Sequence, residues 1–258
     1  MIRQGIWRRS RVRGRGGTGL KTAETVFGAC ESVRKRGRVD VPLEGEDNAL
    51  EALVDAGYTV DVGTIPDHGN DFDIQYVEPT RRRYDATDPD RILSHSTGGL
   101  VAVHLESSAP RVYLSPWWGM AGESGLLQRL LVSLPTARPV IPVPDDPGAL
   151  GDLATERQVA AGPDNVAPAF LRTVADSQER LPAFRGDSVV FCSLGDRVVG
   201  VDAIGEHAPA ERTVLYDGGH ELFTSSSRDR TVEWVLATLA DGPDALTGPV
   251  RAEHPPQE

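Results

Sequence analysis

Short apolar runs alternate with longer segments of mixed polarity along most of the chain. The runs that predict strands are rich in Val, Leu, Tyr or Thr and end at turn-forming residues; they lie at 25–27, 58–65, 111–115, 188–194 and 212–216. The segments that predict helices lie at 47–56, 165–180, 199–206 and 228–240. Strands separated by helices predict an α/β fold, with a mostly parallel, twisted sheet and helices on both faces.

The stretch 90–106 joins the end of a buried strand to an apolar helix through a run of small residues. A serine between small residues at such a turn is what a nucleophile elbow requires, and Ser96 has that place. Its hydroxyl would project from the sheet, where the first amides of the helix can stabilise an oxyanion. The usual pattern is Gly-x-Ser-x-Gly, whereas Ser94 replaces the first glycine here. A turn that only lets backbone segments pack closely is the alternative interpretation.

Two further polar residues follow predicted strands. Asp196 comes after the strand at 188–194, and His220 after the strand at 212–216. Because sites in parallel sheets form at the carboxyl ends of the strands, Ser96, Asp196 and His220 are expected on one edge of the sheet. Their order along the chain is that of the α/β-hydrolases.

Other roles for these residues stay open. Asp196 could cap the helix that follows it, and His220 could be an ordinary loop histidine. Asp217 is an alternative acid, although it is close to His220 in sequence. His68 and His95 are interpreted as structural residues that hold loops around the elbow. The residues with no assigned role are His104, His207, Glu221 and His254.

Residues 47–240 resemble an α/β-hydrolase of the lysophospholipase, monoacylglycerol-lipase and serine-aminopeptidase branch. The resemblance rests on three motifs: Ser-His-Ser-Thr-Gly-Gly at 94–99, Gly-Asp-Arg-Val-Val at 195–199 and Gly-Gly-His-Glu-Leu-Phe at 218–223. The stretch 58–69 is similar to the strand and Pro-x-His-Gly loop that precede the elbow in that family. The resemblance implies the α/β-hydrolase fold, with a small helical cap inserted after the sixth strand.

The family's chemistry implies a serine hydrolase that cleaves a carboxylic ester without a metal or cofactor. His220 would take the proton of Ser96 as the hydroxyl attacks the acyl carbonyl, Asp196 would orient the imidazole, and water would hydrolyse the acyl-enzyme. The Thr97 amide would supply one oxyanion donor. The second donor comes from the loop after the strand that precedes the first helix, where a His-Gly usually follows an apolar run; that place in this chain has no His-Gly, which leaves Gly28 or Ala29. This departure implies an altered or truncated N-terminus. It also supports the alternative, a non-catalytic or weakly active hydrolase-like protein that binds small molecules.

The pattern divides the chain into four parts. Residues 1–45 are a basic segment that is hard to assign, and 46–121 with 186–240 form the hydrolase core. Between them, 122–185 lose the strand–helix alternation and predict a helical cap or lid, with helices near 124–134 and 150–160. The tail, 241–258, is rich in Pro, Gly and acidic residues and is expected to be disordered. Within the core, 70–89 are polar, and Arg81-Arg82-Arg83 predicts a solvated face. Trp117 and Trp118 follow a strand end and predict the lining of an apolar pocket.

The net charge of −11 argues against nucleic acid or anionic membranes as partners. Lysine is scarce and acidic residues are many, a balance typical of extreme halophiles, although a high-GC genome would also favour arginine. Residues 1–38 carry eleven Arg or Lys against two Glu, a net +9, and the rest of the chain therefore carries −20. The arginines at 8–15 resemble a twin-arginine export signal or a nucleic-acid-binding arm, but no apolar segment follows them. We favour a segment outside the globular domain.

Neither a membrane span nor a disulfide framework is expected. No window of 18 apolar residues occurs, and Cys30 and Cys192 are too few for a disulfide or metal framework. These features predict a cytoplasmic protein, and the resemblance implies a small-molecule ester as its substrate. The oligomeric state stays open.

Overall fold

The computed structural model describes residues 21–27, 52, 53, 55–65, 69–122, 134, 136–143, 146–155 and 165–246. Several predictions made above lie outside these residues: those on the segment 1–20, Gly28, Ala29, His68, the helix near 124–134 and the tail 247–258.

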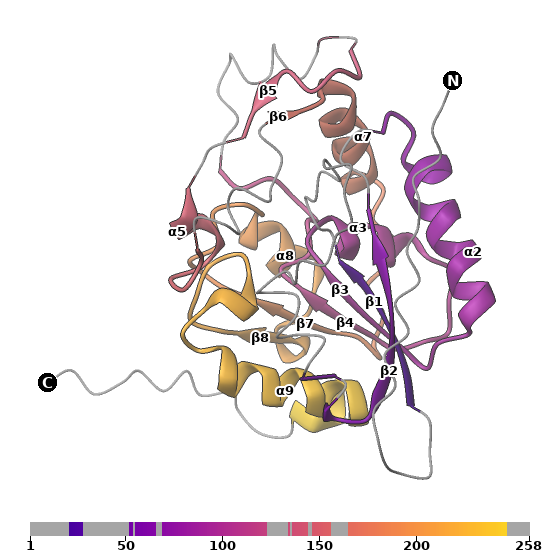
Figure 1. Ribbon diagram of the computed structural model, residues 1–258, viewed down its shortest axis with the longest axis vertical. Helices are drawn as coiled ribbons and strands as arrows, with labels where there is room; N and C mark the ends of the chain where they lie inside the picture. The colour runs from indigo at the N-terminus through magenta and orange to yellow at the C-terminus, as the bar shows by residue number, and fades with distance from the viewer. Residues whose placement is uncertain are drawn as a thin grey trace, which may run out of the picture.

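A six-stranded parallel sheet forms the centre of the molecule (Figure 1), with the strand order β2-β1-β3-β4-β7-β8. The strands are β1 (Lys21–Phe27), β2 (Tyr58–Thr64), β3 (Arg91–His95), β4 (Arg111–Leu114), β7 (Val189–Cys192) and β8 (Thr213–Leu215). Each prediction of a strand made above is confirmed. β1 lies inside the sheet between β2 and β3, so part of the segment 1–45 belongs to the core.

Helices cover both faces of the sheet, as predicted. Along β3, Ile92 packs in one apolar cluster and Leu93 in another, because successive side chains of a strand point to opposite faces. The first cluster contains residues of α3 (Thr97–His104), α7 (Pro168–Gln178) and α8 (Val201–His207). The second contains Val235 and Leu239 of α9 (Arg228–Asp241). The fold is therefore the layered α/β arrangement that buries a parallel sheet on both sides.

The polar stretch 70–89 forms a continuous helical segment, η1 (Asp73–Val77) and α2 (Glu78–Thr87), which the sequence pattern did not indicate. The prediction that all three arginines are solvated is wrong for Arg83. Its guanidinium binds the Asp61 carboxylate of β2, with Nε–Oδ2 at 3.0 Å, and both side chains are largely buried. Arg81 and Arg82 do face solvent, where they pair with Glu78. Helical periodicity explains why Arg83 differs from Arg81 and Arg82, because it turns position 83 toward the sheet.

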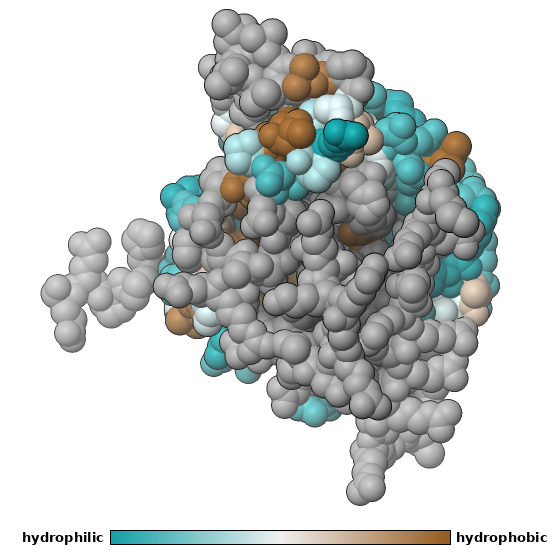
Figure 2. Space-filling view, turned by 45° about the horizontal axis from the view of Figure 1, so that its top comes forward, coloured by the Kyte–Doolittle hydropathy of each residue, from teal (hydrophilic) through white to brown (hydrophobic). Residues whose placement is uncertain are grey.

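The inserted segment leaves the core after β4, the fourth of the described strands, and returns at β7. Its described part contains α5 (Pro147–Leu150), α7 and a short antiparallel pair, β5 (Ile141–Pro142) with β6 (Asn165–Val166). α7 packs on the body through Phe170 and Val174. Figure 2 shows brown apolar surface beside hydrophilic surface at the top of the view. Among the described residues of the insertion, the exposed large apolar side chains are Leu134, Val140, Val143 and Leu153.

The C-terminal helix extends further than expected. α9 continues to Asp241, and a 3-10 helix, η4 (Gly242–Leu246), follows it directly. Leu246 packs against the apolar cluster under α9, which gives this part of the acidic tail a reason to be ordered. The prediction that disorder begins at 241 is therefore wrong for residues 241–246. Among the helices that the structure describes, none is long and apolar enough to cross a membrane.

Candidate active site

Ser96 occupies a sharp turn between strand β3 and helix α3. Its backbone has φ 51° and ψ −122°, a region that residues other than glycine rarely adopt. Neighbouring strands and loops hold this conformation: the Ser96 amide donates to the Leu114 carbonyl at 3.1 Å, and the Ser96 carbonyl accepts from Trp117 and Gly99. The predicted strand-to-helix turn is thus present, and it carries the strain that a nucleophile elbow requires.

A small residue is needed one turn into α3. A Cβ atom on Gly99 would lie 2.6 Å from Cβ of Pro116 and 2.9 Å from its Cα, closer than such atoms can pack. Pro116 belongs to the chain just after β4, whose Leu114 pairs with His95. The glycine therefore lets the first turn of α3 approach the end of the neighbouring strand, and this contact supports the turn at Ser96.

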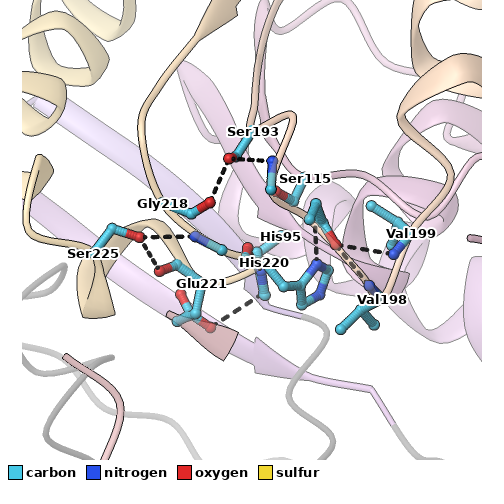
Figure 3. A network of polar contacts seen from close by, with 12 residues as sticks. His95, Ser115, Ser193, Val198, Val199, Gly218, His220, Glu221 and Ser225 are labelled. Atoms are coloured by element: carbon cyan, nitrogen blue, oxygen red, sulfur yellow. Dashed lines mark hydrogen bonds and ion pairs between the residues drawn. The ribbon is translucent and has the colours of Figure 1, made fainter. Parts of the chain in front are cut away.

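Asp196 and His220 follow the strands β7 and β8, and both are buried. Nδ1 of His220 donates a hydrogen bond to Oδ2 of Asp196 at 2.9 Å, while Oδ1 of Asp196 accepts from the amides of Val198 (2.8 Å) and Val199 (3.0 Å), as Figure 3 shows. α8 begins only at Val201, so Asp196 orders the loop before the helix instead of capping the helix. The carboxylate is therefore satisfied on both oxygens.

Electrostatics keep Asp196 ionised. Burial by itself would raise the pKa of this carboxyl, but the attraction and hydrogen bond of His220, together with the two backbone amides, leave the pKa below its ordinary value of 3.8. An ionised Asp196 accepts a proton-bearing Nδ1 and leaves Nε2 of His220 as the basic nitrogen. His220 contacts this carboxylate and not that of Asp217, the alternative acid.

The loop that carries His220 is held on several sides. Its own amide donates to the Ala149 carbonyl at 3.1 Å, and the next amide, of Glu221, donates to the Leu150 carbonyl at 2.7 Å. The Tyr216 hydroxyl, just after β8, donates to the Gly219 carbonyl at 2.7 Å. Because Ala149 and Leu150 belong to the inserted segment, the insertion is bonded directly to the loop of the candidate base.

His95 links the strand that ends at Ser96 to the loop of His220. The ring centroids of His95 and His220 are 4.7 Å apart, and His95 is the residue that precedes Ser96. Among the hydrogen bonds of the described residues, none joins the Ser96 hydroxyl to the His220 ring. In hydrolases this contact often tightens only in the complex with substrate.

Two oxyanion donors were expected, at Thr97 and Gly28. Thr97 is the first residue of α3, so its amide is at the positive end of the helix. Gly28 lies outside the described residues, but β1 ends at Phe27, which pairs with His95. The chain therefore leaves β1 at the edge of the sheet where Ser96 lies.

Trp117 and Trp118, which were expected to line a pocket, lie in different surroundings. Trp118 is buried in the core, where its Nε1 donates to the Gly99 carbonyl at 3.3 Å and its ring packs edge-on against Tyr113 and His207. Trp117 is half-buried, with its ring 6.0 Å from that of Phe170. The pocket interpretation is therefore wrong for Trp118, because its indole packs inside the apolar cluster under α3 and α8.

A surface cavity of about 540 Å³ lies elsewhere, beside α8 and the end of β8. Its walls include Cys192, Leu194, Asp202 and Leu215, and neither tryptophan nor Ser96. Burial raises the pKa of the Cys192 thiol to about 12, so this thiol stays protonated at neutral pH. We assign this cavity no role in the site.

The interpretation of His95 as a structural residue that holds a loop around the elbow agrees with its contact with the His220 carbonyl, whereas the sequence pattern indicated no role for Glu221, Tyr216 and the backbone of 149–150. His95 and Glu221 face each other at the His220 loop, and Tyr216 and the backbone of 149–150 bond that loop. Their positions beside Ser96 and His220 in the sequence were the available signal for the first two. Nothing in the sequence pattern indicated that α5 would meet this loop.

The solved structures that resemble this chain share its fold at low sequence identity. A monoacylglycerol lipase from Paleococcus ferrophilus matches with a TM-score of 0.65 and 16% identity, over 90% of this chain and 98% of the other. The N-acyl homoserine lactonase AidH, in complex with N-butanoyl homoserine, matches with a TM-score of 0.61 and 11% identity, over 96% and 100% of the two chains. A structure of the metagenome-derived lipolytic enzymes LipS and LipT has a TM-score of 0.60 and 15% identity, over 89% and 96%.

No protein-family model matches the sequence, and neither does any curated protein. The six-stranded parallel sheet, the turn at Ser96 and the solved structures together identify the architecture. The chain has the α/β-hydrolase fold.

Proposed function

We propose that this protein is a serine hydrolase that cleaves a carboxylic ester through an acyl-enzyme on Ser96. The observation that carries the proposal is the hydrogen-bonded pair of Asp196 and His220, whose imidazole packs against His95, the residue before a serine with positive φ. A carboxylate–imidazole pair next to a serine is the arrangement that activates a hydroxyl for acyl transfer. Structures with the same fold include a monoacylglycerol lipase and a lactonase, both of which act on ester bonds.

In the proposed reaction, Nε2 of His220 takes the proton of Ser96 as Oγ attacks the acyl carbonyl. Asp196 holds the imidazole with its proton on Nδ1 and stabilises the imidazolium that forms. The Thr97 amide, and Gly28 as the second donor, stabilise the tetrahedral oxyanion. His220 then returns its proton to the leaving alcohol, and water attacks the acyl-enzyme by the same route. No metal or cofactor takes part in this scheme.

We propose a small-molecule ester as the substrate, in line with the lipolytic enzymes that share the fold. The insertion is bonded to the His220 loop, so it lies beside the site, and the exposed apolar residues on it provide surface for an acyl chain. We expect p-nitrophenyl esters of short to medium acyl chains to be hydrolysed, with a preference that the insertion sets.

The proposal is tested by labelling with a fluorophosphonate probe and by hydrolysis of p-nitrophenyl butyrate. We expect the probe to label Ser96 and both signals to disappear in Ser96→Ala, while the thermal midpoint stays near that of the parent. Folded parent protein that is neither labelled nor active would overturn the proposal. Ester binding that persists in both proteins without hydrolysis would support a non-catalytic binding protein instead.

A further inference from the structure

The His95 side chain joins the strand that ends at the candidate nucleophile to the loop of the candidate base. His95 is the last residue of β3, directly before Ser96, and its side chain is buried. Its ring packs against the His220 ring with the planes tilted by 48°, and its Nε2 is 3.2 Å from the His220 backbone carbonyl (Figure 3). A side chain of the elbow strand is thus in direct contact with both the ring and the backbone of the base.

The hydrogen bond of Nε2 defines the tautomer of His95. A carbonyl oxygen only accepts hydrogen bonds, so Nε2 of His95 carries the ring proton and donates a hydrogen bond to the His220 carbonyl. Nδ1 faces Oε2 of Glu221 at 3.7 Å. Glu221 follows His220 in sequence, so both contacts of His95 are on the same short loop.

Burial favours the neutral form of His95. It lowers the pKa of this imidazole, against the opposing pull of Glu221, and the neighbouring His220 lowers it further. A neutral ring does not repel the positive charge that His220 acquires when it takes the proton of Ser96. His95 can therefore hold the base at close range without opposing its protonation.

The orientation of the His220 ring depends on its backbone. Asp196 fixes Nδ1 and the Ala149 carbonyl fixes the amide, while the His220 carbonyl accepts from His95 and lies 3.3 Å from the Tyr216 hydroxyl. Of these contacts, the one from His95 comes from the strand that ends at Ser96. It therefore sets the position of the base relative to the nucleophile.

We propose that His95 is a positioning residue that aligns His220 with Ser96 through the Nε2 hydrogen bond to the His220 carbonyl. The proposal rests on the proposed hydrolase function. It assigns His95 no contact with substrate, so its effect belongs on the rate of acylation and not on substrate binding.

Three substitutions separate this role from simple packing. His95→Gln keeps an amide nitrogen at about the reach of Nε2, whereas the shorter amide of His95→Asn cannot reach the His220 carbonyl, and His95→Leu removes the donor. We expect kcat and the rate of fluorophosphonate labelling to fall about 10- to 100-fold in the Asn and Leu variants, because a small displacement of the base costs rates of this order. KM should change little, and His95→Gln should keep most of the activity.

His104 provides a matched control. It lies at the other end of α3, is partly buried, and its Nε2 bonds a backbone carbonyl, that of Ser177, at 3.1 Å. His104→Leu should lower the thermal midpoint as His95→Leu does but leave kcat within about twofold of the parent, because no contact of His104 reaches the His220 loop.

The outcomes are distinct. Equal kcat in the Gln and Asn variants, or in His95→Leu and the parent, would overturn the positioning role while parent activity still supports the hydrolase. If His95→Leu does not fold, the comparison of Gln with Asn decides. Parent protein that the probe does not label would reject the hydrolase function itself, and the positioning role with it.

Discussion

Asp196 and His220 face each other across the ends of two neighbouring strands, with Oδ2 of the carboxylate 2.9 Å from Nδ1 of the imidazole. The second oxygen of Asp196 holds the amides of Val198 and Val199, so the acid is bound to its own loop while it orients the base. Ser193 adds a second link between the two loops, since its hydroxyl donates to the Gly218 carbonyl at 2.5 Å. The relative position of acid and base is thus set by backbone contacts as well as by their own hydrogen bond.

Asp196→Asn should disable the base while leaving the loop nearly intact. The carboxamide oxygen can still accept from the amides of Val198 and Val199, but its NH₂ group then faces Nδ1 of His220 and favours the tautomer with the proton on Nε2. We expect kcat for p-nitrophenyl butyrate to fall by about 10⁴-fold, the order that this change of tautomer costs in a serine protease. Asp217→Asn is the control, and a similar loss in that variant would show that the acid has been assigned wrongly.

The same aspartate should make the stability depend on pH in acid. A carboxyl whose pKa is lower in the folded chain contributes stability that is complete above its ordinary pKa of 3.8 and is lost as the pH falls through the folded-state value. The urea midpoint of the parent should therefore fall more steeply than that of Asp196→Asn between about pH 5 and about pH 3. Parallel curves for the two proteins would contradict the lowered pKa.

Gly99→Ala should destabilise the turn at Ser96. The new methyl group would meet Pro116 at 2.6 Å, and overpacking of this kind costs about 1–3 kcal/mol. Because the displaced segment supports the elbow, labelling of Ser96 by the probe should slow as well. Gly205→Ala, in helix α8, is the matched control, since its Cβ meets nothing within 4 Å. A Gly99→Ala protein as stable and as reactive as the Gly205→Ala protein would refute the packing argument.

Ser94→Ala should leave the protein equally stable or make it more stable. The Ser94 hydroxyl is buried and, in the part of the chain that the structure describes, has no hydrogen-bond partner. Removing a buried polar group without a partner recovers a desolvation cost of about 1–3 kcal/mol, against the small loss of packing at one oxygen atom. Thermal unfolding measures the change. A fall in the midpoint would indicate that the hydroxyl has a bonded partner outside the described residues.

Gly151→Val should displace the insertion from the loop of the candidate base. A Cβ on Gly151 would lie 2.5 Å from the Thr224 carbonyl oxygen, next to the bonds that Ala149 and Leu150 make with His220 and Glu221. We expect kcat to fall about tenfold or more because His220 loses support at its amide. Gly186→Val, at a position with nothing within 4 Å, should leave kcat unchanged. Unchanged kcat in both variants would show that the base does not depend on the insertion.

The sequence by itself indicated the strands, the turn at Ser96 and the positions of Asp196 and His220. This succeeded because the buried strands are short apolar runs with turn-forming residues at their ends. Parallel strands also bring their carboxyl ends to one edge, so polar residues at three such ends are expected to meet.

Only the tertiary structure decided which polar and aromatic side chains are buried, and which of them hold this site. Arg83 is buried because α2 packs beside β2, and Trp118 is in the core because α3 and α8 close over it. The contact of His95 with His220 joins residues 125 positions apart. Burial and hydrogen bonding of this kind depend on which elements pack together, and a local pattern of polar and apolar residues carries no information about that.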